Sequence, residues 1–234
     1  MPNIVFPTGA LVRGGMLYLY YGGADTVISL ATVPLDRLLS VMRKTESHIV
    51  TLNRYDGNPI IRPEPNHPWE SKAVFNPAAV HLNDTVHVLY RAMSADNTSS
   101  IGYAKSADGF QINERLPEPV YAPRAPFEQK VVPNGNSGCE DPRLTVMDST
   151  VYMTYTAYDG KHSPRGALTS IAQGDFLAKR WNWEMPIPMT APDVDNKDVA
   201  LFPKKIRGMY AVLHRQHNKD IWIDFVTDLK FGEG

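Results

Sequence analysis

The stretch LYLYYGGADTVISLATVPLD (Leu17–Asp36) holds the pattern that decides the fold: a β-branched and aromatic run, a polar turn and a second apolar run. This pattern predicts a β-hairpin. It returns in VHVLYRAMSADNTSSIGYAKSADGF (Val86–Phe110), VYMTYTAYDGKHSPRGALTSIAQGDF (Val151–Phe176) and MYAVLHRQHNKDIWIDFVTDLKF (Met209–Phe231). The anchor residues of the four stretches, Tyr20, Tyr90, Tyr155 and His214, lie about 60–70 residues apart. Such a period is typical of one four-stranded blade, so the sequence predicts a β-propeller with an axial pocket.

The composition is ordinary for a globular protein. The 234 residues are 43% hydrophobic and 21% charged with a formal net charge of −1, which offers no basic surface for nucleic acid or an anionic membrane. No apolar run reaches the roughly 18 residues of a membrane span, and the start MPNIVFPTGALVRGG lacks a secretory signal pattern. Cys139 stands alone, and no cluster has the spacing of metal ligands. We therefore expect a cytoplasmic protein that binds no metal, nucleic acid or membrane.

The order of the segments predicts an all-β chain that does not close a ring. Helix-like spacing is confined to residues 35–44, and 19 prolines with 16 glycines fit a turn-rich β protein. The first hairpin begins too close to the start to follow a full blade, and the last one ends the chain. We therefore expect an incomplete propeller of about three to four blades. Its unpaired strand edges would favour self-association or pairing with a complementary segment.

The densest polar cluster is Asn134-Gly-Asn-Ser-Gly-Cys-Glu-Asp-Pro-Arg143, which we expect to be a loop before a strand at residues 144–147. Glu140, Asp141 and Arg143 can pair acids with a cation there, and Pro142 restricts the backbone. Carboxylates are the usual acid and base groups for glycosidic bonds. The alternative is a surface turn that holds an ion pair.

Seven sequence strings in this chain occur in the same order as in members of a known family. They are AVFNPAAV (Ala73–Val80), LYRAM (Leu89–Met93), IGYAKSADGF (Ile101–Phe110), GCEDPRLT (Gly138–Thr145), YMTYTAYDG (Tyr152–Gly160), NKDVALFPKKI (Asn196–Ile206) and LHR (Leu213–Arg215). In these strings the chain resembles glycoside hydrolase family 130, the β-mannoside phosphorylases and related β-mannosidases. The resemblance implies a five-bladed propeller, incomplete in this chain.

The resemblance also divides the chain. NIVFPTGALVRGGMLYLYYGGADT (Asn3–Thr26) is similar to the family's C-terminal, ring-closing end, yet here it comes first. Residues 1–45 would therefore be the ring-closing segment, and residues 46–234 would be the family's N-terminal blades. The chain would be either a circular permutant or a fragment across two tandem copies. We expect Asn3–Thr26 to share a blade with the segment that begins after Leu52.

The resemblance implies a role for each candidate site residue. Asp141 would be the general acid that protonates the glycosidic oxygen. The mannose subsite would be lined by Asp25, Asn76 and Arg91, with Glu140 and Arg143 as further substrate contacts. Inorganic phosphate, a co-substrate, would bind where Arg165, Lys197 and His214 converge, because a phosphate dianion requires several cations or donors.

Three functions follow as hypotheses. The first is an inverting phosphorylase that cleaves β-mannosides, of the β-1,4-mannooligosaccharide type, to α-mannose 1-phosphate and a shortened acceptor, with no cofactor. Phosphate is then itself the nucleophile, so one protein acid suffices. The second is a β-mannosidase, which requires a second carboxylate to activate water. The third is an inactive fragment that at most binds carbohydrate.

Overall fold

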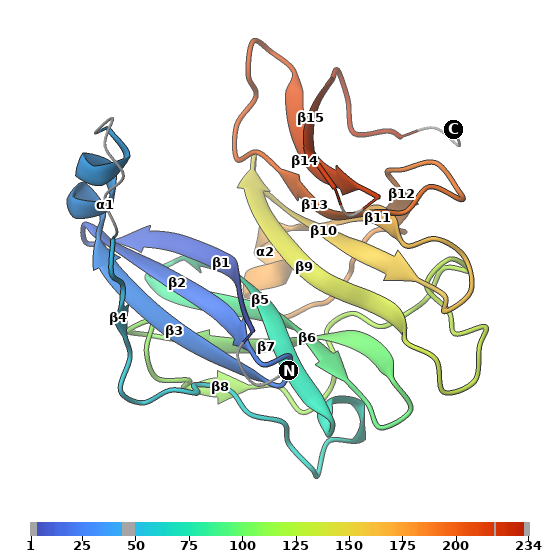
Figure 1. Cartoon of the computed structure of the whole chain (residues 1–234), viewed down its shortest axis with the longest axis horizontal. Helices are drawn as coiled ribbons and strands as arrows, with labels where there is room; N and C mark the ends of the chain where they lie inside the picture. The colour runs from blue at the N-terminus through green and yellow to red at the C-terminus, as the bar shows by residue number, and fades with distance from the viewer. Residues whose placement is uncertain (1–3, 44–49, 218, 232–234) are drawn as a thin grey trace.

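The computed structural model describes residues 4–43, 50–217 and 219–231, and it consists of strands with two short α-helices and one 3-10 turn (Figure 1). The expected all-β class is therefore confirmed. No helix in the described ranges has the length and apolar character that crossing a membrane requires. The described strands fall into three hydrogen-bonded sheets.

The first sheet has the order β1-β2-β3-β4. Its strands are β1 (Val5–Arg13), β2 (Met16–Gly23), β3 (Val27–Pro34) and β4 (Asn53–Arg54). The first hairpin belongs to a four-stranded unit, because β1 precedes it and β4 completes the sheet. β4 pairs with β3 at Ala31 and Thr32, so the segment after Leu52 shares this sheet with the start of the chain, as expected. The helix α1 (Leu35–Met42) follows β3 directly, inside the predicted range 35–44.

The second sheet has eight strands and consists of two antiparallel halves. One half is β5 (Ala73–Leu82), β6 (Thr85–Met93), β7 (Thr98–Ser106) and β8 (Glu114–Arg115). The other is β9 (Ser137–Met147), β10 (Thr150–Tyr158), β11 (Arg165–Ala172) and β12 (Ile187–Pro188). A short parallel pairing of Thr98 and Ser99 with Ser137 and Gly138 joins them. The turn η1 (Pro68–Glu70) precedes β5, and α2 (Gln173–Leu177) follows β11.

The third sheet has the order β13-β14-β15. Its strands are β13 (Asn196–Leu201), β14 (Tyr210–Gln216) and β15 (Ile221–Val226). β15 is an edge strand on which Ile221, Trp222, Ile223 and Phe225 are exposed. Counting the halves of the eight-stranded sheet separately, the described chain has three four-stranded units and one three-stranded unit. This agrees with three to four blades, while a five-bladed ring remains a prediction.

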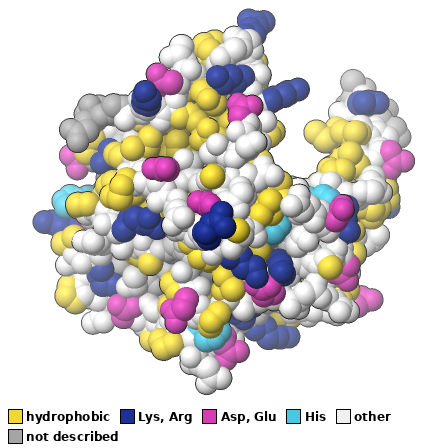
Figure 2. All heavy atoms as spheres, turned by 180° about the vertical axis from the view of Figure 1, so that it is seen from behind, with side chains coloured by type: hydrophobic (Ala, Val, Ile, Leu, Met, Phe, Trp, Pro, Cys, Tyr) yellow, Lys and Arg dark blue, Asp and Glu magenta, His cyan; other side chains and the backbone are white. Residues whose placement is uncertain are grey.

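The core lies between neighbouring units. One buried cluster joins Tyr20 and Ile28 of the first unit to Val88 and Tyr90 of the second, and another joins the second unit to the third. Buried anchor tyrosines also satisfy their hydroxyl groups: Tyr20 donates to the Gly109 carbonyl (2.6 Å) and Tyr90 to Glu70 Oε2 (2.8 Å). The space-filling view shows the molecule hollowed between the lobe that carries α1 and the lobe that carries β13–β15 (Figure 2). Charges of both signs are interspersed on this face.

Candidate active site

The first strands of the four units contribute to one cavity of about 630 Å³, which we call the axial cavity. Its lining combines carboxylates, cations and a few apolar side chains. The lining residues are Phe6, Pro7, Thr8, Asp25, Thr26, Lys72, Ala73, Phe75, Asn76, Arg91, Met93, Glu140, Asp141, Arg143, Lys197, Asp198 and Arg215. This volume is within the usual range of small-molecule sites.

Each first strand has a register shift where it reaches the cavity, and one residue of each irregular segment lines it: Thr8, Asn76, Asp141 and Asp198. A bulge removes a residue from the ladder and redirects its side chain. Three of these residues have a left-handed backbone, with φ of 48° at Asn76, 52° at Asp141 and 57° at Asp198. Asn and Asp tolerate this conformation better than most residues do. The repeated bulge therefore aims polar side chains from separate units at one cavity.

Asp141 is held by groups from the neighbouring unit. Its Oδ1 accepts a hydrogen bond from Asn76 Nδ2 at 2.9 Å and lies 3.3 Å from Arg91 Nη1. Asn76 and Arg91 are both buried, so these contacts are shielded from bulk water. The carboxylate is thereby fixed in one position beside the cavity, as a general acid requires.

Glu140 is the second carboxyl of this cluster, and Arg91 Nη2 contacts its Oε1 at 2.7 Å. The guanidinium of Arg91 is itself fixed, because Nε donates to Ser99 Oγ at 3.0 Å and the group lies over the Phe75 ring. Burial raises the pKa of Glu140, and the neighbouring Asp141 raises this pKa further, against the opposing effect of Arg91. The two adjacent carboxyls therefore have different electrostatic environments.

Cations gather on the side of the cavity formed by β9, β13 and β14. Asp198 lies between two of them, with Oδ2 accepting from Arg215 Nε at 2.7 Å and Oδ1 3.6 Å from Arg143 Nη2. Arg143 also donates from Nη1 to the Asp141 carbonyl at 3.0 Å. Lys197, the residue before the bulge, lines the same cavity. This side can offer several charged donors to an anion.

Most of the predicted site residues therefore lie together. Those that line the axial cavity are Asp25, Asn76, Arg91, Glu140, Asp141, Arg143 and Lys197. Asp25 lies in the β2–β3 turn and reaches the same cavity as Asn76 and Asp141, as expected. These placements were predicted mainly by the resemblance, since the residues are far apart in the sequence.

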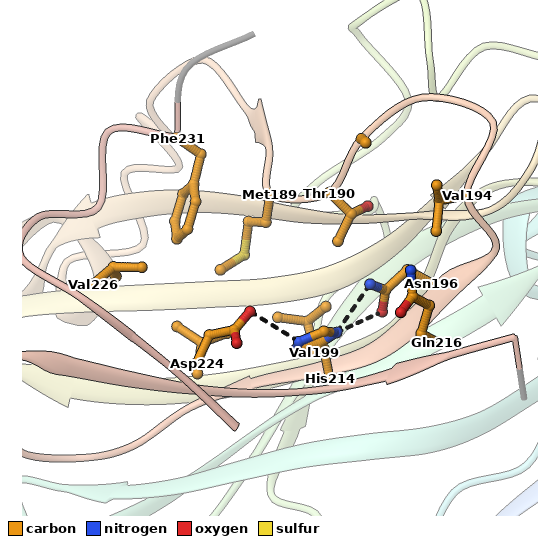
Figure 3. Close-up of a pocket in the computed structure, with 12 residues that line it drawn as sticks. Met189, Thr190, Val194, Asn196, Val199, His214, Gln216, Asp224, Val226 and Phe231 are labelled. Carbon is orange, nitrogen blue, oxygen red and sulfur yellow. Dashed lines mark hydrogen bonds and ion pairs between the residues drawn. The ribbon is translucent and has the colours of Figure 1, made fainter. Parts of the chain in front are cut away.

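The predicted convergence of Arg165, Lys197 and His214 is not present in this arrangement. Arg165 lines two cavities beside Phe127, and its Nε donates to the Thr190 carbonyl at 3.0 Å. His214 lines a separate cavity of about 200 Å³ under Phe231 (Figure 3). The physical reason is strand geometry: side chains alternate between the faces of a strand, so His214 lies on the opposite face of β14 from Arg215. Arg165 lies on β11, the third strand of its unit.

Both ring nitrogens of His214 are engaged in this smaller cavity. Nε2 lies 3.0 Å from Asp224 Oδ2, and Nδ1 lies 2.9 Å from Asn196 Nδ2 and 3.2 Å from Asn196 Oδ1 (Figure 3). Apolar side chains such as Met189 and Val226 line the rest of the cavity. The phosphate contacts of His214 and Arg165 therefore stay predictions that this geometry does not support.

One local expectation is wrong. Glu140, Asp141 and Arg143 do not lie in a loop before a strand at residues 144–147, because β9 already begins at Ser137. Pro142 lies in the bulge of β9. Gly138 allows β7 to approach closely at Ser99. Sequence analysis also missed Asp198 and Arg215. The equivalence of Asp198 to Asp141 becomes visible only in the strand register, where Lys197-Asp198 occupies the position in β13 that Glu140-Asp141 occupies in β9.

The described part of the chain contains no set of side chains arranged as metal ligands. Within residues 4–43, 50–217 and 219–231, no group of three or more His, Cys, Asp or Glu side chains is placed to hold a metal ion. Three of the axial carboxyls, those of Glu140, Asp141 and Asp198, form ion pairs with arginines.

Together, the four sheet units and the cavity that their first strands share define a propeller-like all-β protein. A glycosyl hydrolase structure from Bacteroides ovatus is 28% identical, with a TM-score of 0.62 over 74% of this chain and 54% of that chain. A thermostable family-43 glycoside hydrolase shares the fold alone, at 14% identity and a TM-score of 0.67 over 100% of this chain and 72% of that one. The sequence profile of the β-1,4-mannooligosaccharide phosphorylase family matches residues 1–44 and 46–230. The chain belongs to this family, glycoside hydrolase family 130.

Two relatives come from Thermoanaerobacter sp. (strain X514). A 1,2-β-oligomannan phosphorylase is 33% identical over 189 residues, which are 78% of this chain and 59% of the relative. A β-1,2-mannobiose phosphorylase is 35% identical over 185 residues, which are 74% of this chain and 56% of the relative. The chain therefore spans less than two thirds of the length of these relatives.

Proposed function

We propose that the axial cavity catalyses inverting phosphorolysis of β-mannosides, which yields α-mannose 1-phosphate and a shortened acceptor sugar. The observation that carries this proposal is the meeting of a fixed carboxyl, Asp141, with Arg143, Lys197 and Arg215 in one cavity. Membership of the family and the names of the two relatives support the same chemistry. Phosphate is the co-substrate, and the reaction requires no further cofactor.

In the proposed mechanism, Asp141 donates its proton to the glycosidic oxygen while a phosphate oxygen attacks the anomeric carbon from the opposite face. The bond from the anomeric carbon to the leaving oxygen breaks, and a bond to phosphate forms. A single displacement inverts the configuration, so a β-mannoside gives the α-phosphate. Phosphate replaces the water that a hydrolase would activate with a second carboxylate.

The remaining lining residues would bind the two substrates. Asp25, Asn76 and Arg91 would line the mannose subsite, because all three line the cavity on the side formed by the first two units, and Asn76 and Arg91 contact Asp141. Lys197, Arg143 and Arg215 would hold phosphate on the opposite side. Charge-assisted donors of this kind stabilise the anion and the negative charge it carries in the transition state.

A β-mannosidase is the second candidate, and one observation favours it. Asp25, Glu140 and Asp198 also line the axial cavity, so a second carboxylate is available to activate water. The raised pKa of Glu140 also makes this residue an alternative proton donor. Carbohydrate binding without catalysis is the third candidate.

One assay separates these functions. The purified 234-residue chain would be incubated with β-1,2- or β-1,4-mannobiose, with and without inorganic phosphate. Consumption only in the presence of phosphate supports the proposal and identifies the linkage. Release of free mannose at the same rate without phosphate would establish the mannosidase, and saturable binding without turnover would establish a binding protein.

The division into residues 1–45 and 46–234, self-association and a cytoplasmic setting also stay proposals.

A further inference from the structure

The side chain of Asn76 has one satisfied end and one buried, unpaired end. Its Nδ2 donates to Asp141 Oδ1 at 2.9 Å. Because Asp141 Oδ1 accepts from the amide nitrogen of Asn76, the amide oxygen points away from this carboxyl oxygen. That oxygen is buried and has no hydrogen-bond partner among the described residues. The orientation of the amide therefore depends on Asp141 and on the space available to the oxygen.

Gly22 of β2 provides that space. A Cβ atom added to Gly22 would lie 2.5 Å from Asn76 Oδ1 and 3.0 Å from the Asn76 backbone nitrogen. The first distance is shorter than real Cβ contacts allow, so any side chain at this position would push the amide of Asn76 out of place. The next residue, Gly23, differs, because its Cβ would meet Val27 Cγ2 at an ordinary 3.4 Å.

We propose that Gly22 is a positioning residue that keeps the Asn76 amide in the orientation that holds Asp141. This inference rests on the proposed phosphorolysis at the axial cavity. Gly22 lies in β2 of the first unit, pairs with Phe6 and Ile28 in its sheet, and is not among the residues that line the axial cavity. Because Gly22 has no side chain, β2 can approach the bulge of β5. A larger residue at position 22 would displace the Asn76 amide and weaken its hydrogen bond to Asp141.

The matched pair Gly22→Ala and Gly23→Ala tests this role. Both changes add one methyl group to the same strand. Gly22→Ala should lower kcat for phosphorolysis by about 10- to 100-fold, the range expected for misplacement of a catalytic group, with a smaller change in KM for the mannoside. Gly23→Ala should stay near the parent. Equal kcat values for Gly22→Ala and the parent would overturn the inference.

A stability cycle tests the contact without any activity. Urea unfolding would be measured for Gly22→Ala in the parent and in an Asn76→Gly background, where glycine tolerates the left-handed backbone. The loss of stability should be clearly smaller without the Asn76 side chain, and a double variant that folds where Gly22→Ala does not would give the same answer. Equal losses, or a failure of both to fold while Gly23→Ala folds, would overturn the inference. An inactive parent would instead count against the proposed function, while the cycle would still decide the contact.

Discussion

Arg91 connects the two carboxyls of the axial cavity, with Nη2 2.7 Å from Glu140 and Nη1 3.3 Å from Asp141. The side chain of Arg91 is 9% exposed. Its interactions with the two carboxyls are therefore stronger than they would be in bulk water, because the dielectric constant is lower inside the protein. Two neighbouring carboxylates would otherwise repel each other, and this repulsion would favour protonation of one of them. At the scale of single residues, the electrostatics of the site therefore depend on Arg91, which contacts both Glu140 and Asp141.

The acid role assigned to Asp141 predicts a large loss for a small change. Asp141→Asn keeps the shape and the tolerance for φ of 52° but cannot donate the proton, so kcat for phosphorolysis should fall by about 100-fold or more. Thermal unfolding should change little. Asp148→Asn is the matched control, since Asp148 is an exposed turn residue with φ of 48°. Parental activity in Asp141→Asn, together with a loss in Glu140→Gln, would transfer the acid role to Glu140.

The raised pKa of Glu140 predicts a pH dependence of stability. Burial raises this pKa, so between the ordinary and the raised value the folded chain binds more protons than the unfolded chain, and the free energy of unfolding falls as pH rises. Glu140→Gln removes this titration. The stability of Glu140→Gln relative to the parent should therefore increase with pH from about 4.3, the ordinary value of a glutamate.

Urea unfolding at several pH values measures this difference. Glu118→Gln serves as the control, because Glu118 is exposed. A parent and a Glu140→Gln variant with the same pH slope would contradict the electrostatic description of the site.

At the scale of elements, the joint between β7 and β9 determines how the second and third units meet. Gly138 has φ of 106°, and a Cβ atom there would lie 2.1 Å from the Ser99 carbonyl oxygen. The glycine therefore permits the parallel pairing of Ser99 with Gly138. Since Glu140 and Asp141 follow directly, the same close approach sets their position opposite Asn76 and Arg91.

Gly138→Ala should consequently destabilise the fold. The clash involves backbone on both sides and cannot be relieved by a rotamer change, so we expect a loss of at least about 1–3 kcal/mol in the free energy of unfolding. Urea unfolding provides the measurement. Gly174→Ala is the control, because nothing lies within 4 Å of its added Cβ. Equal stabilities of the two variants would show that β7 and β9 are not joined closely here.

The hairpins and the helix α1 (Leu35–Met42) could be predicted from sequence because they depend on neighbouring residues. The nature of residues 137–143 could not, since glycines and Asp-Pro suggest a loop as readily as a bulged strand. Only the contact with Ser99, some 40 residues earlier in the chain, decides between them. The residues of the axial cavity were predicted by family resemblance, whereas Asp198 and Arg215 required the register of β13 and β14.

At the scale of the whole molecule, the axial cavity exists because four units present their first strands to one place. Asp141 comes from the third unit, and its partners Asn76 and Arg91 come from the second. The cations Lys197 and Arg215 come from the fourth. Of the three residues predicted to contact phosphate, Lys197 lines the axial cavity, whereas Arg165 and His214 line other cavities and contact local partners there. This distribution among cavities is a property of three-dimensional packing that spacing in the sequence does not reveal.

The cationic side of the cavity predicts the effect of removing one charge. Lys197→Met keeps the length of the side chain, so KM for phosphate should rise by about tenfold or more, the equivalent of one hydrogen bond to a charged group. KM for the mannoside should change less. Lys161→Met, at an exposed turn position, is the matched control. An unchanged KM for phosphate in Lys197→Met would place the anion elsewhere.

The central claim is that phosphate itself displaces the acceptor at the axial cavity in one step. The most direct measurement is ³¹P and ¹H NMR of the first product formed from β-mannobiose and inorganic phosphate by the 234-residue chain. α-Mannose 1-phosphate should be the first product, in amounts that match the acceptor released, and none should form with Asp141→Asn. Free mannose as the first product, or the β-anomer of the phosphate, would contradict it.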